Sequence, residues 1–344
     1  MHLTFRPYSL ELRHSFSIAG NSRDTTSVVF AELMHEGHTG YGEASLPPYL
    51  PETQLSVCEF LGQIRLQQFS DPLKTDDILD YVMELAPGNL AAKAAFDMAL
   101  HDLQGKLQNK PCFELFKANR DKMPETSFTI GMDTPEKVKL KAAEAGSFKI
   151  LKIKLGGAND KEIIKAIRQV SFKPLCVDAN QGWTDKRQAL EMIYWLRDEG
   201  VKFIEQPLPK ANKEDMIWLT EHSPLPTIAD ESCQTLADLD AVQGVFRGIN
   251  IKLMKCGGIR EARRMIEEAK KRDLKILMGC MNESSNAVMA AASLAPFCNY
   301  ADLDGPFLVT NNPFEDPELR GGKIRLSGQA GLGLKIRGAQ PAQE

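Results

Sequence analysis

The chain has 344 residues, of which 43% are hydrophobic and 26% charged, an ordinary globular composition that excludes a disordered, collagen-like or coiled-coil chain. Its 46 acidic and 42 basic residues give a net charge of −4 without a basic stripe, so we expect small molecules as partners and no nucleic acid. No apolar run has the length of a membrane span, and seven cysteines without a CxxC pair argue against a disulfide framework or a zinc site. We expect a cytoplasmic protein without a signal peptide or membrane contact.

The first 120 residues predict an α+β unit. Three segments alternate polar and apolar residues or are rich in β-branched ones, which indicates an antiparallel meander, and three helical patterns follow. The expected strands are 5–12, 27–34 and 39–44, and the expected helices are 52–66, 76–85 and 90–107. Asn89 directly precedes the last helix and is its expected N-cap.

From about residue 126 the pattern changes to short apolar runs, each ending in polar residues and followed by a charged helical stretch. The eight runs are 127–132, 150–155, 174–178, 201–205, 227–230, 248–253, 274–278 and 300–304. Strands that alternate with helices predict parallel βαβ units, and eight units are the number that closes a barrel. An open doubly wound sheet is the alternative, but the GxGxxG turn typical of dinucleotide-binding sheets is missing.

Acidic residues stand at the ends of the third, fourth and fifth runs. Asp178, Glu205 and Asp230 are almost evenly spaced along the chain, so they occupy similar heights in successive βα units and should meet at the barrel mouth. Each acid alone would be explained as the cap of the following helix. Three acids at the same position in successive βα units instead predict one shared metal site. An all-carboxylate site suits Mg²⁺ better than zinc, so magnesium is the expected cofactor. The residues expected around these ligands are Asn180, Gln206 and Glu231.

Lysines end the second and sixth runs. Lys152 and Lys154 are two residues apart, so they share the strand face that points into the mouth. A cationic neighbour favours the neutral form that a base needs, which makes Lys154 the expected proton acceptor and Lys152 its electrostatic partner beside the substrate. Lys252 ends the sixth of the eight runs and is therefore expected nearly opposite Lys154 across the barrel mouth. Two bases on opposite faces of one carbon allow its inversion, while a divalent ion stabilises the enediolate that forms next to a carboxylate. Lys255 is expected on the opposite strand face or already in the following loop, and it receives no role.

With these residues the chain resembles the enolase superfamily, in the branch typified by muconate lactonizing enzyme. The resemblance rests on the two-lysine motif, the three acids and residues 250–258, and it covers nearly the whole chain. It implies an N-terminal α+β capping domain at 1–120, completed by residues 319–344, and a (β/α)7β modified TIM barrel at 121–318. No histidine follows His222, which excludes the branch typified by mandelate racemase.

Residues 300–306 resemble the DxD signature of dipeptide epimerases, in which both acids bind the α-ammonium group of the substrate. Asp302 and Asp304 would share a strand face, and two carboxylates suit a cation with three donors. In this interpretation the substrate's C-terminal carboxylate chelates the metal and the inverted carbon lies between the lysines. Residues 279–284 end the seventh run, and Cys280 and Asn282 among them are expected to contact the substrate through backbone groups.

Preference for the second residue of the substrate is expected to come from capping-domain loops at about 14–26 and 44–53. Arg23 is the only Lys or Arg in these loops, and its guanidinium would select a side-chain carboxylate, as in the murein-derived dipeptide L-Ala-D/L-Glu. The alternative is an apolar pocket for a hydrophobic second residue, lined by Phe16, Ile18, Tyr49 and Leu50.

The sequence therefore predicts an isomerase, a Mg²⁺-dependent epimerase of L-Ala-D/L-Glu-type dipeptides that works by two-base proton transfer, in the metabolism of murein peptides. One alternative is an o-succinylbenzoate synthase or cycloisomerase with the same metal and lysines, but those substrates have no ammonium group for Asp302 and Asp304. A catalytically silent barrel is another, disfavoured because every lysine and metal acid is present. A homo-oligomer is compatible with the sequence.

Overall fold

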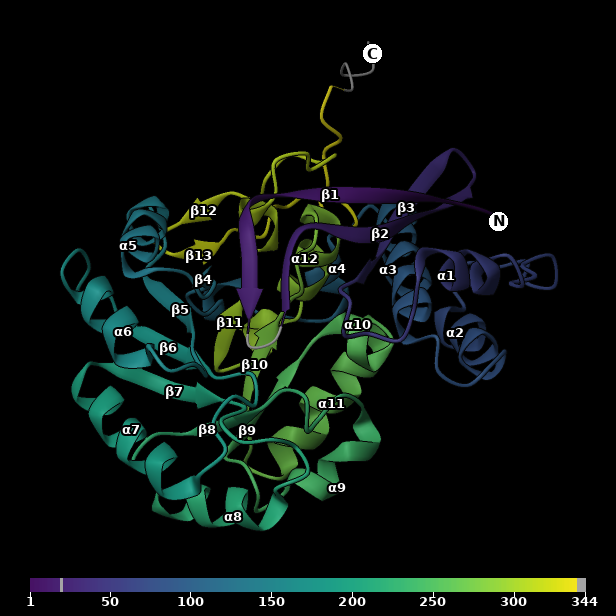
Figure 1. The fold of residues 1–344 in the computed structure, drawn as a ribbon. Coiled ribbons are helices and arrows are strands. Elements are labelled where there is room, and N and C mark those ends of the chain that lie inside the picture. The colour runs from purple at the N-terminus through teal and green to yellow at the C-terminus, as the bar shows by residue number, and fades with distance from the viewer. Residues whose placement is uncertain (19–20, 339–344) are drawn as a thin grey trace.

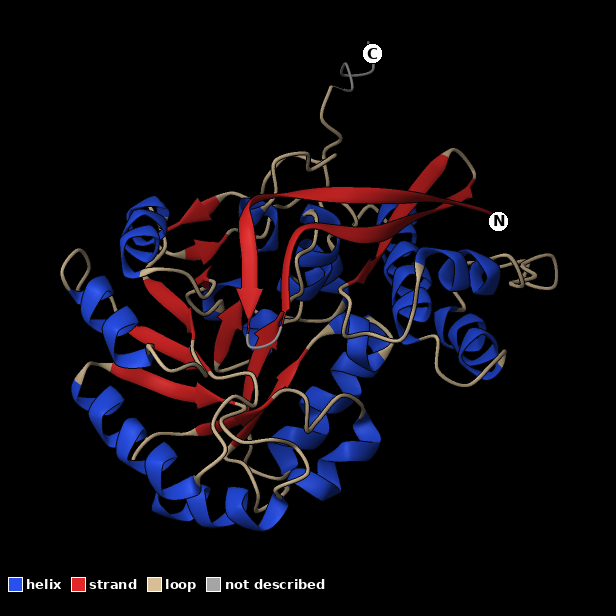
Figure 2. Cartoon of the chain, viewed as in Figure 1, coloured by secondary structure: helices blue, strands red, loops and turns tan. Residues whose placement is uncertain are grey.

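The structure is a computed structural model that describes residues 1–18 and 21–338. Its N-terminal part is a three-stranded antiparallel sheet in the order β1–β2–β3, covered by helices α1 to α3 (Figures 1 and 2). These elements are β1 (His2–Ile18), β2 (Asn21–His35), β3 (His38–Leu46), α1 (Gln54–Leu61), α2 (Thr75–Glu84) and α3 (Leu90–Leu107). The predicted meander and three helices are present, although α1 ends five residues before the predicted 66, with Gly62 as its C-cap.

Helix α3 packs directly on the backbone of β3. A Cβ atom added to Gly40 or Gly42 would lie 2.0 Å from the carbonyl oxygen of Ala99 or 1.8 Å from that of Ala95, so glycine is required on this face of the strand. Alanines on the facing side of the helix complete the close approach.

The start of α3 differs from the prediction. Asn89 occupies the N-cap position but adopts a left-handed conformation, with φ of 52°, and its side chain makes no capping hydrogen bond. The carboxylate of Glu52 instead accepts hydrogen bonds from the backbone N–H groups of Ala91 and Ala92, at 3.0 and 3.1 Å. A charged side chain from outside the helix therefore satisfies donors that the local sequence leaves free.

The second half forms a sheet of eight parallel strands in sequential order, with helices on its outside (Figure 1). Its strands are β4 (Ser127–Ile130), β5 (Ile150–Lys154), β6 (Leu175–Asp178), β7 (Val201–Glu205), β8 (Thr227–Ala229), β9 (Gly248–Ile251), β10 (Lys275–Gly279) and β11 (Tyr300–Asp302). A bridge between Thr126 and Ala301 brings the first and last strands together. The predicted barrel with an N-terminal capping unit is confirmed.

Helices follow the strands and bury their apolar sides against them. They are α5 (Pro135–Glu144), α6 (Asp160–Arg168), α7 (Lys186–Asp198), α8 (Lys213–His222), α9 (Leu239–Val242), α10 (Leu253–Cys256), α11 (Ile259–Lys271) and α12 (Ser285–Ala292). In α11 the buried residues recur at helical spacing while Lys, Arg and Glu fill the outer side, the pattern of a helix that covers a sheet. A short helix, α4 (Cys112–Leu115), precedes the barrel. No described helix is both long and apolar enough to span a membrane.

The inside of the barrel is apolar below its polar mouth. Cys176, Phe203, Ile228 and Leu277 are buried and form a separate hydrophobic cluster. The first three lie two residues before Asp178, Glu205 and Asp230 respectively, and residues two apart on a strand share a face. The same strand faces therefore supply an apolar floor and the acids above it.

The segment at 14–26, predicted as a loop, is a hairpin instead. β1 and β2 pair up to Ile18 and Asn21, after a register shift between Glu11 and Phe16. The hairpin bends toward the centre of the barrel (Figure 1), where the carbonyl of Ser17 accepts a hydrogen bond of 2.9 Å from the N–H of Met132. Residues 21–26 of β2 are all polar, so this part of the strand lacks the apolar alternation that would have indicated it in the sequence.

The tail after the barrel forms a small hairpin of β12 (Leu319–Arg320) and β13 (Lys323–Ile324) and then contacts the N-terminal part. The N–H of Leu332 donates a 2.7 Å hydrogen bond to Asp102 in α3. The domain boundary near residue 120 stays a prediction, and positions 339–344 of the predicted completing segment lie outside the described residues.

Candidate active site

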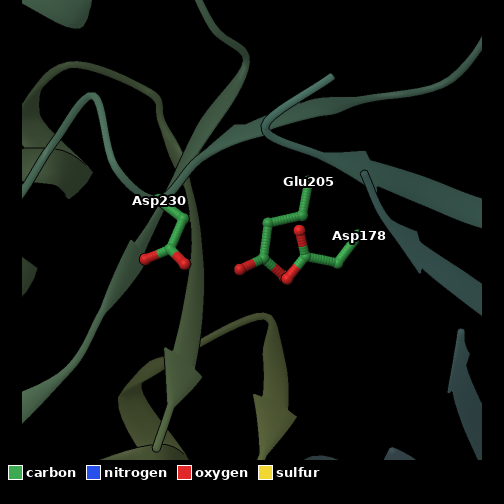
Figure 3. A group of neighbouring side chains, drawn as sticks. All are labelled: Asp178, Glu205 and Asp230. Carbon is green, nitrogen blue, oxygen red and sulfur yellow. The ribbon is translucent and has the colours of Figure 1, made fainter. Parts of the chain in front are cut away.

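Three carboxylates meet at the mouth of the barrel. Asp178 ends β6, Glu205 ends β7 and Asp230 directly follows β8, and each offers an oxygen within 4.8 Å of the others (Figure 3). All three residues are buried, at 0 to 4% exposure. Three carboxylates aimed at one point form an all-oxygen donor set, which fits Mg²⁺.

Neighbouring polar side chains orient the three acids. Asn250 donates a 2.7 Å hydrogen bond to Oε1 of Glu205, and the side-chain oxygen of Gln206 accepts from the N–H of Asp230 at 3.1 Å. Asn180 donates to Glu231 at 3.4 Å, beside the ligands as predicted. No role was expected of Asn250, although its place two residues before Lys252, on the same strand face, was an available signal.

Lys152 lies among carboxylates. Its Nζ is 2.7 Å from Glu205, 2.8 Å from Asp302 and 3.3 Å from Asp178. Burial lowers the pKa of Lys152, but the carboxylates, Asp302 foremost, outweigh burial and raise that pKa well above its ordinary value. The side chain is therefore a fixed cation at the centre of the site.

Lys154 and Lys252 lie on opposite sides of the mouth. Lys154 contacts Asp178 at 2.6 Å and Lys252 contacts Asp230 at 2.8 Å. Their strands, β5 and β9, are separated by β6, β7 and β8 in the eight-stranded sheet, half of the way around a closed barrel. Burial lowers the pKa of Lys252, but Asp230 raises it more, so that Lys252 is held as a cation.

Lys255 lies beyond the end of β9, as one of the two expectations had it, but it contacts Asp230 although no role was expected of it. The short helix α10 turns its side chain back toward Asp230, and its Nζ lies 2.5 Å from Oδ1 of that residue and 3.0 Å from its carbonyl oxygen. Burial raises the pKa of Asp230, but Lys252 and Lys255 together bring it well below its ordinary value.

Asp302 and Asp304 both lie in the site, but not on one strand face as predicted. β11 ends at Asp302, and Asp304 occupies the turn that follows. Asp302 accepts a 2.6 Å hydrogen bond from Ser127, and Asp304 accepts one of 2.5 Å from the N–H of Thr129. Burial and the neighbouring Asp302 raise the pKa of Asp304 to about 7.

The predicted substrate contacts surround one cavity of about 40 Å³. Its lining includes Arg23, Lys152, Lys154, Lys252, Cys280, Asn282, Asp302 and Asp304. A larger open groove, of about 650 Å³, lies beside α8 and α9. We place the active site at the smaller cavity because the lysines and acids gather there.

Arg23 reaches the cavity from β2. Its guanidinium lies 5.2 Å from the ring centre of Phe16 and 5.8 Å from that of Tyr49, and it donates a hydrogen bond to the side-chain oxygen of Asn282. Leu50, named for the apolar alternative, packs against the main hydrophobic core instead, and the side chain of Ile18 lies outside the described part of the chain.

Comparison with known proteins identifies both halves of the chain. A family described as "Mandelate racemase / muconate lactonizing enzyme, N-terminal domain" matches residues 3–116, and "Enolase C-terminal domain-like" matches residues 134–340. The chain is 52% identical over 335 residues to an L-Ala-D/L-Glu epimerase of Bacteroides thetaiotaomicron, which covers 97% of this chain and 88% of the relative.

Two solved structures are similar throughout. One is a substrate-liganded L-Ala-D/L-Glu epimerase from Bacillus subtilis, with a TM-score of 0.89 and 27% identity, covering 97% of this chain and 98% of the other. The other is a dipeptide epimerase from Enterococcus faecalis complexed with Mg and L-Leu-L-Tyr, with a TM-score of 0.87, 31% identity and the same coverage.

Proposed function

This chain belongs to the mandelate racemase/muconate lactonizing enzyme family of the enolase superfamily and is an isomerase, and from that premise we propose that it is a Mg²⁺-dependent dipeptide epimerase. The proposed reaction inverts the α-carbon of the second residue of an L-Ala-D/L-Glu-type dipeptide. The observation that carries it is the pair Lys154 and Lys252, held on opposite walls of one cavity by separate acids.

The proposed chemistry is a two-base proton transfer. One lysine removes the proton from the α-carbon, the electrons move into the adjacent carboxylate to give an enediolate, and the other lysine returns a proton to the opposite face. The two lysines exchange roles when the other epimer is the substrate. Lys252, a cation beside Asp230, is suited to give the proton when Lys154 accepts one.

Asp178, Glu205 and Asp230 are the proposed Mg²⁺ ligands. When bound there, the ion supplies electrostatic stabilisation of the negative charge that develops on the substrate carboxylate. The buried cation of Lys152, between Glu205 and Asp302, adds a second positive charge on the same side.

The α-ammonium group of the dipeptide is proposed to bind Asp302 and Asp304. Both acids line the cavity, so a buried cation there would have two anionic partners. An o-succinylbenzoate synthase or cycloisomerase would leave these acids without a positively charged partner on the substrate, and no observation favours that alternative.

Arg23 is proposed to bind the side-chain carboxylate of the second residue. Support comes from its half-buried guanidinium at the cavity and from the name of the Bacteroides relative. A hydrophobic second residue is the remaining alternative, since Phe16 and Tyr49 line the same cavity and the Enterococcus enzyme was solved with L-Leu-L-Tyr.

An Ala-Glu dipeptide is a fragment of murein, so we place the reaction in the breakdown of murein peptides in the cytoplasm. All seven cysteines lie among the described residues and are free thiols, as a reducing compartment requires. We also propose that the protein forms a homo-oligomer.

The experiment is incubation with Mg²⁺ in D₂O of a set of L-Ala-X dipeptides, followed by mass spectrometry and chiral analysis of X. We expect inversion of X with one deuterium at its α-carbon, fastest for L-Ala-L-Glu. N-acetyl-L-Ala-L-Glu is the control, because acetylation removes the positive charge that Asp302 and Asp304 would bind. The proposal fails if no dipeptide in the set gains deuterium.

A further inference from the structure

Asn282 links the barrel to the arginine that overhangs it. It lies in the turn between β10 and α12 and is 3% exposed. Its side-chain oxygen accepts a hydrogen bond from Nη2 of Arg23, which comes from a strand 259 positions away in the sequence. Two aromatic rings, those of Phe16 and Tyr49, pack against the same guanidinium and limit its orientation further.

The turn that carries Asn282 is itself tied to the N-terminal sheet. The backbone oxygen of Asn282 accepts a 2.9 Å hydrogen bond from Ser45 of β3. The carboxylate of Glu43, also in β3, accepts hydrogen bonds from the N–H of Ser284 at 2.9 Å and from its hydroxyl at 2.5 Å. Since β3 pairs with β2, which carries Arg23, both partners of the Arg23–Asn282 bond are held by one sheet.

One nitrogen of the guanidinium has no partner of its own. Among the described residues, Nη1 of Arg23 is buried and without a hydrogen bond, although Arg23 lines the cavity that contains the lysines. A buried donor left unpaired is costly, so its pairing with a ligand is favourable. Because Nη2 is fixed by Asn282, Nη1 is fixed in direction as well, through the planar fork of the guanidinium.

We propose that Asn282 is a positioning residue that sets the reach of Arg23 and thereby selects both the charge and the length of the substrate's second side chain. This inference rests on the proposed function. A guanidinium held at one distance can pair with a glutamate carboxylate, whereas an aspartate carboxylate, one methylene shorter, leaves Nη1 unpaired. A neutral glutamine side chain has the right length but forms no charge-assisted bond.

The test compares L-Ala-L-Glu, L-Ala-L-Asp and L-Ala-L-Gln on the full-length protein with Mg²⁺, by turnover and by calorimetric binding. In Asn282→Ala, Nη2 of Arg23 loses its hydrogen bond, while Nε keeps one of 3.3 Å to the hydroxyl of Thr26. The guanidinium is then less well oriented, so we expect kcat/KM for L-Ala-L-Glu to fall roughly ten- to a hundredfold, mainly through KM, and the Glu-over-Asp preference to shrink. L-Ala-L-Gln should change by less than about threefold, since it never used the charge.

In Asn282→Asp we expect the preference for charge to be lost and the preference for length to be kept. Its carboxylate keeps Arg23 in place but neutralises it, so the Glu-over-Gln preference should fall while discrimination by length remains. Asn159→Ala is the matched control, because Asn159 is exposed and makes no capping hydrogen bond. It should leave all three substrates unchanged.

Two outcomes overturn the inference. Unaltered ratios among the three substrates in Asn282→Ala would show that Asn282 does not position Arg23, and an equal loss for all three would show a merely structural role. If the wild-type protein binds L-Ala-L-Glu in preference to the other two but inverts none of them, the proposed function fails, and the binding ratios of the variants still decide the inference.

Discussion

Lys255 holds Asp230 by the carboxylate oxygen that Lys252 does not contact. Lys255 lies 2.5 Å from Oδ1, and Lys252 lies 2.8 Å from Oδ2. The same ammonium group of Lys255 donates to the carbonyl oxygens of Asp230 and Asn250, at 3.0 and 3.1 Å. One buried cation therefore fixes the backbone and the side chain of a proposed metal ligand from behind.

Replacing Lys255 should weaken the metal site. In Lys255→Met, Asp230 loses the contact that orients it, so we expect the affinity for Mg²⁺ to fall about ten- to a hundredfold, measured by Mg²⁺ titration of activity and by calorimetry. Lys141→Met is the matched control, because Lys141 is also buried and paired, with Asp133 at 3.0 Å, but away from the acids. Loss of thermal stability in both variants with unchanged Mg²⁺ affinity would contradict this role.

Removing each proposed base alone should show which epimer that base deprotonates. Lys154→Ala and Lys252→Ala should each lose inversion by a factor of about 10² to 10⁴. Each variant should still exchange the α-proton of one epimer with D₂O, and the two variants should choose opposite epimers. Exchange would be followed by NMR on pure epimers, with the exposed Lys161→Ala as the control. Both variants choosing the same epimer would place the lysines on one face of the substrate.

A buried acid pair predicts how stability depends on pH. Burial, and then the neighbouring Glu43, raise the pKa of Glu283 from its ordinary 4.5 to about 8. The folded state therefore binds a proton that the unfolded state releases, so this group's contribution to stability declines as the pH rises from about 4.5 to 8. The charge of Lys252 opposes this rise in the pKa of Glu283.

Glu283→Gln should reduce that decline, because the amide stays neutral and keeps an oxygen for the N–H of Met281. Urea unfolding of both proteins at several pH values between 5 and 8 gives the slopes. Glu125→Gln, at an exposed position that forms no salt bridge among the described residues, is the control and should keep the wild-type slope. Parallel slopes for Glu283→Gln and the wild-type protein would rule out this carboxyl as the source.

The contact between β3 and α3 predicts a strong effect of one methyl group. In Gly42→Ala the new Cβ would lie 1.8 Å from the carbonyl oxygen of Ala95, so strand and helix must move apart. We expect a loss of about 1–3 kcal/mol in the free energy of unfolding, measured with urea. Gly328→Ala is the matched control, since nothing lies within 4 Å of its Cβ and little change is expected. Equal stability of the two variants would show that β3 and α3 can move apart at little cost, which would contradict this prediction.

The barrel and its acids were predictable because both depend on local patterns. Each strand is a short apolar run, and parallel strands place their carboxyl ends at one rim, so Asp178, Glu205 and Asp230 could be brought together without knowledge of the packing. The pairing of Lys152 with Asp302 was harder to foresee, because it depends on the closure of the barrel, which brings β11 beside β4 and so within reach of β5.

The parts that sequence reasoning missed depend on contacts between distant segments. Glu52 takes the capping role expected of Asn89, and nothing near Glu52 in the sequence indicates this. Lys255 returns to Asp230 because a four-residue helix follows β9, and such a short helix has no periodic signal. The hairpin that carries Arg23 reads as a loop because residues 21–26 are all polar and do not alternate with apolar ones.

The apolar cluster of Cys176, Phe203, Ile228 and Leu277 fills the barrel directly beneath the acids. Water and ligands therefore cannot pass through the barrel axis, and the substrate must arrive and the product must leave on the side that the β1–β2 hairpin overhangs. Any change that stiffens this hairpin would be expected to slow arrival and departure together, even where it leaves every group at the reacting carbon in place.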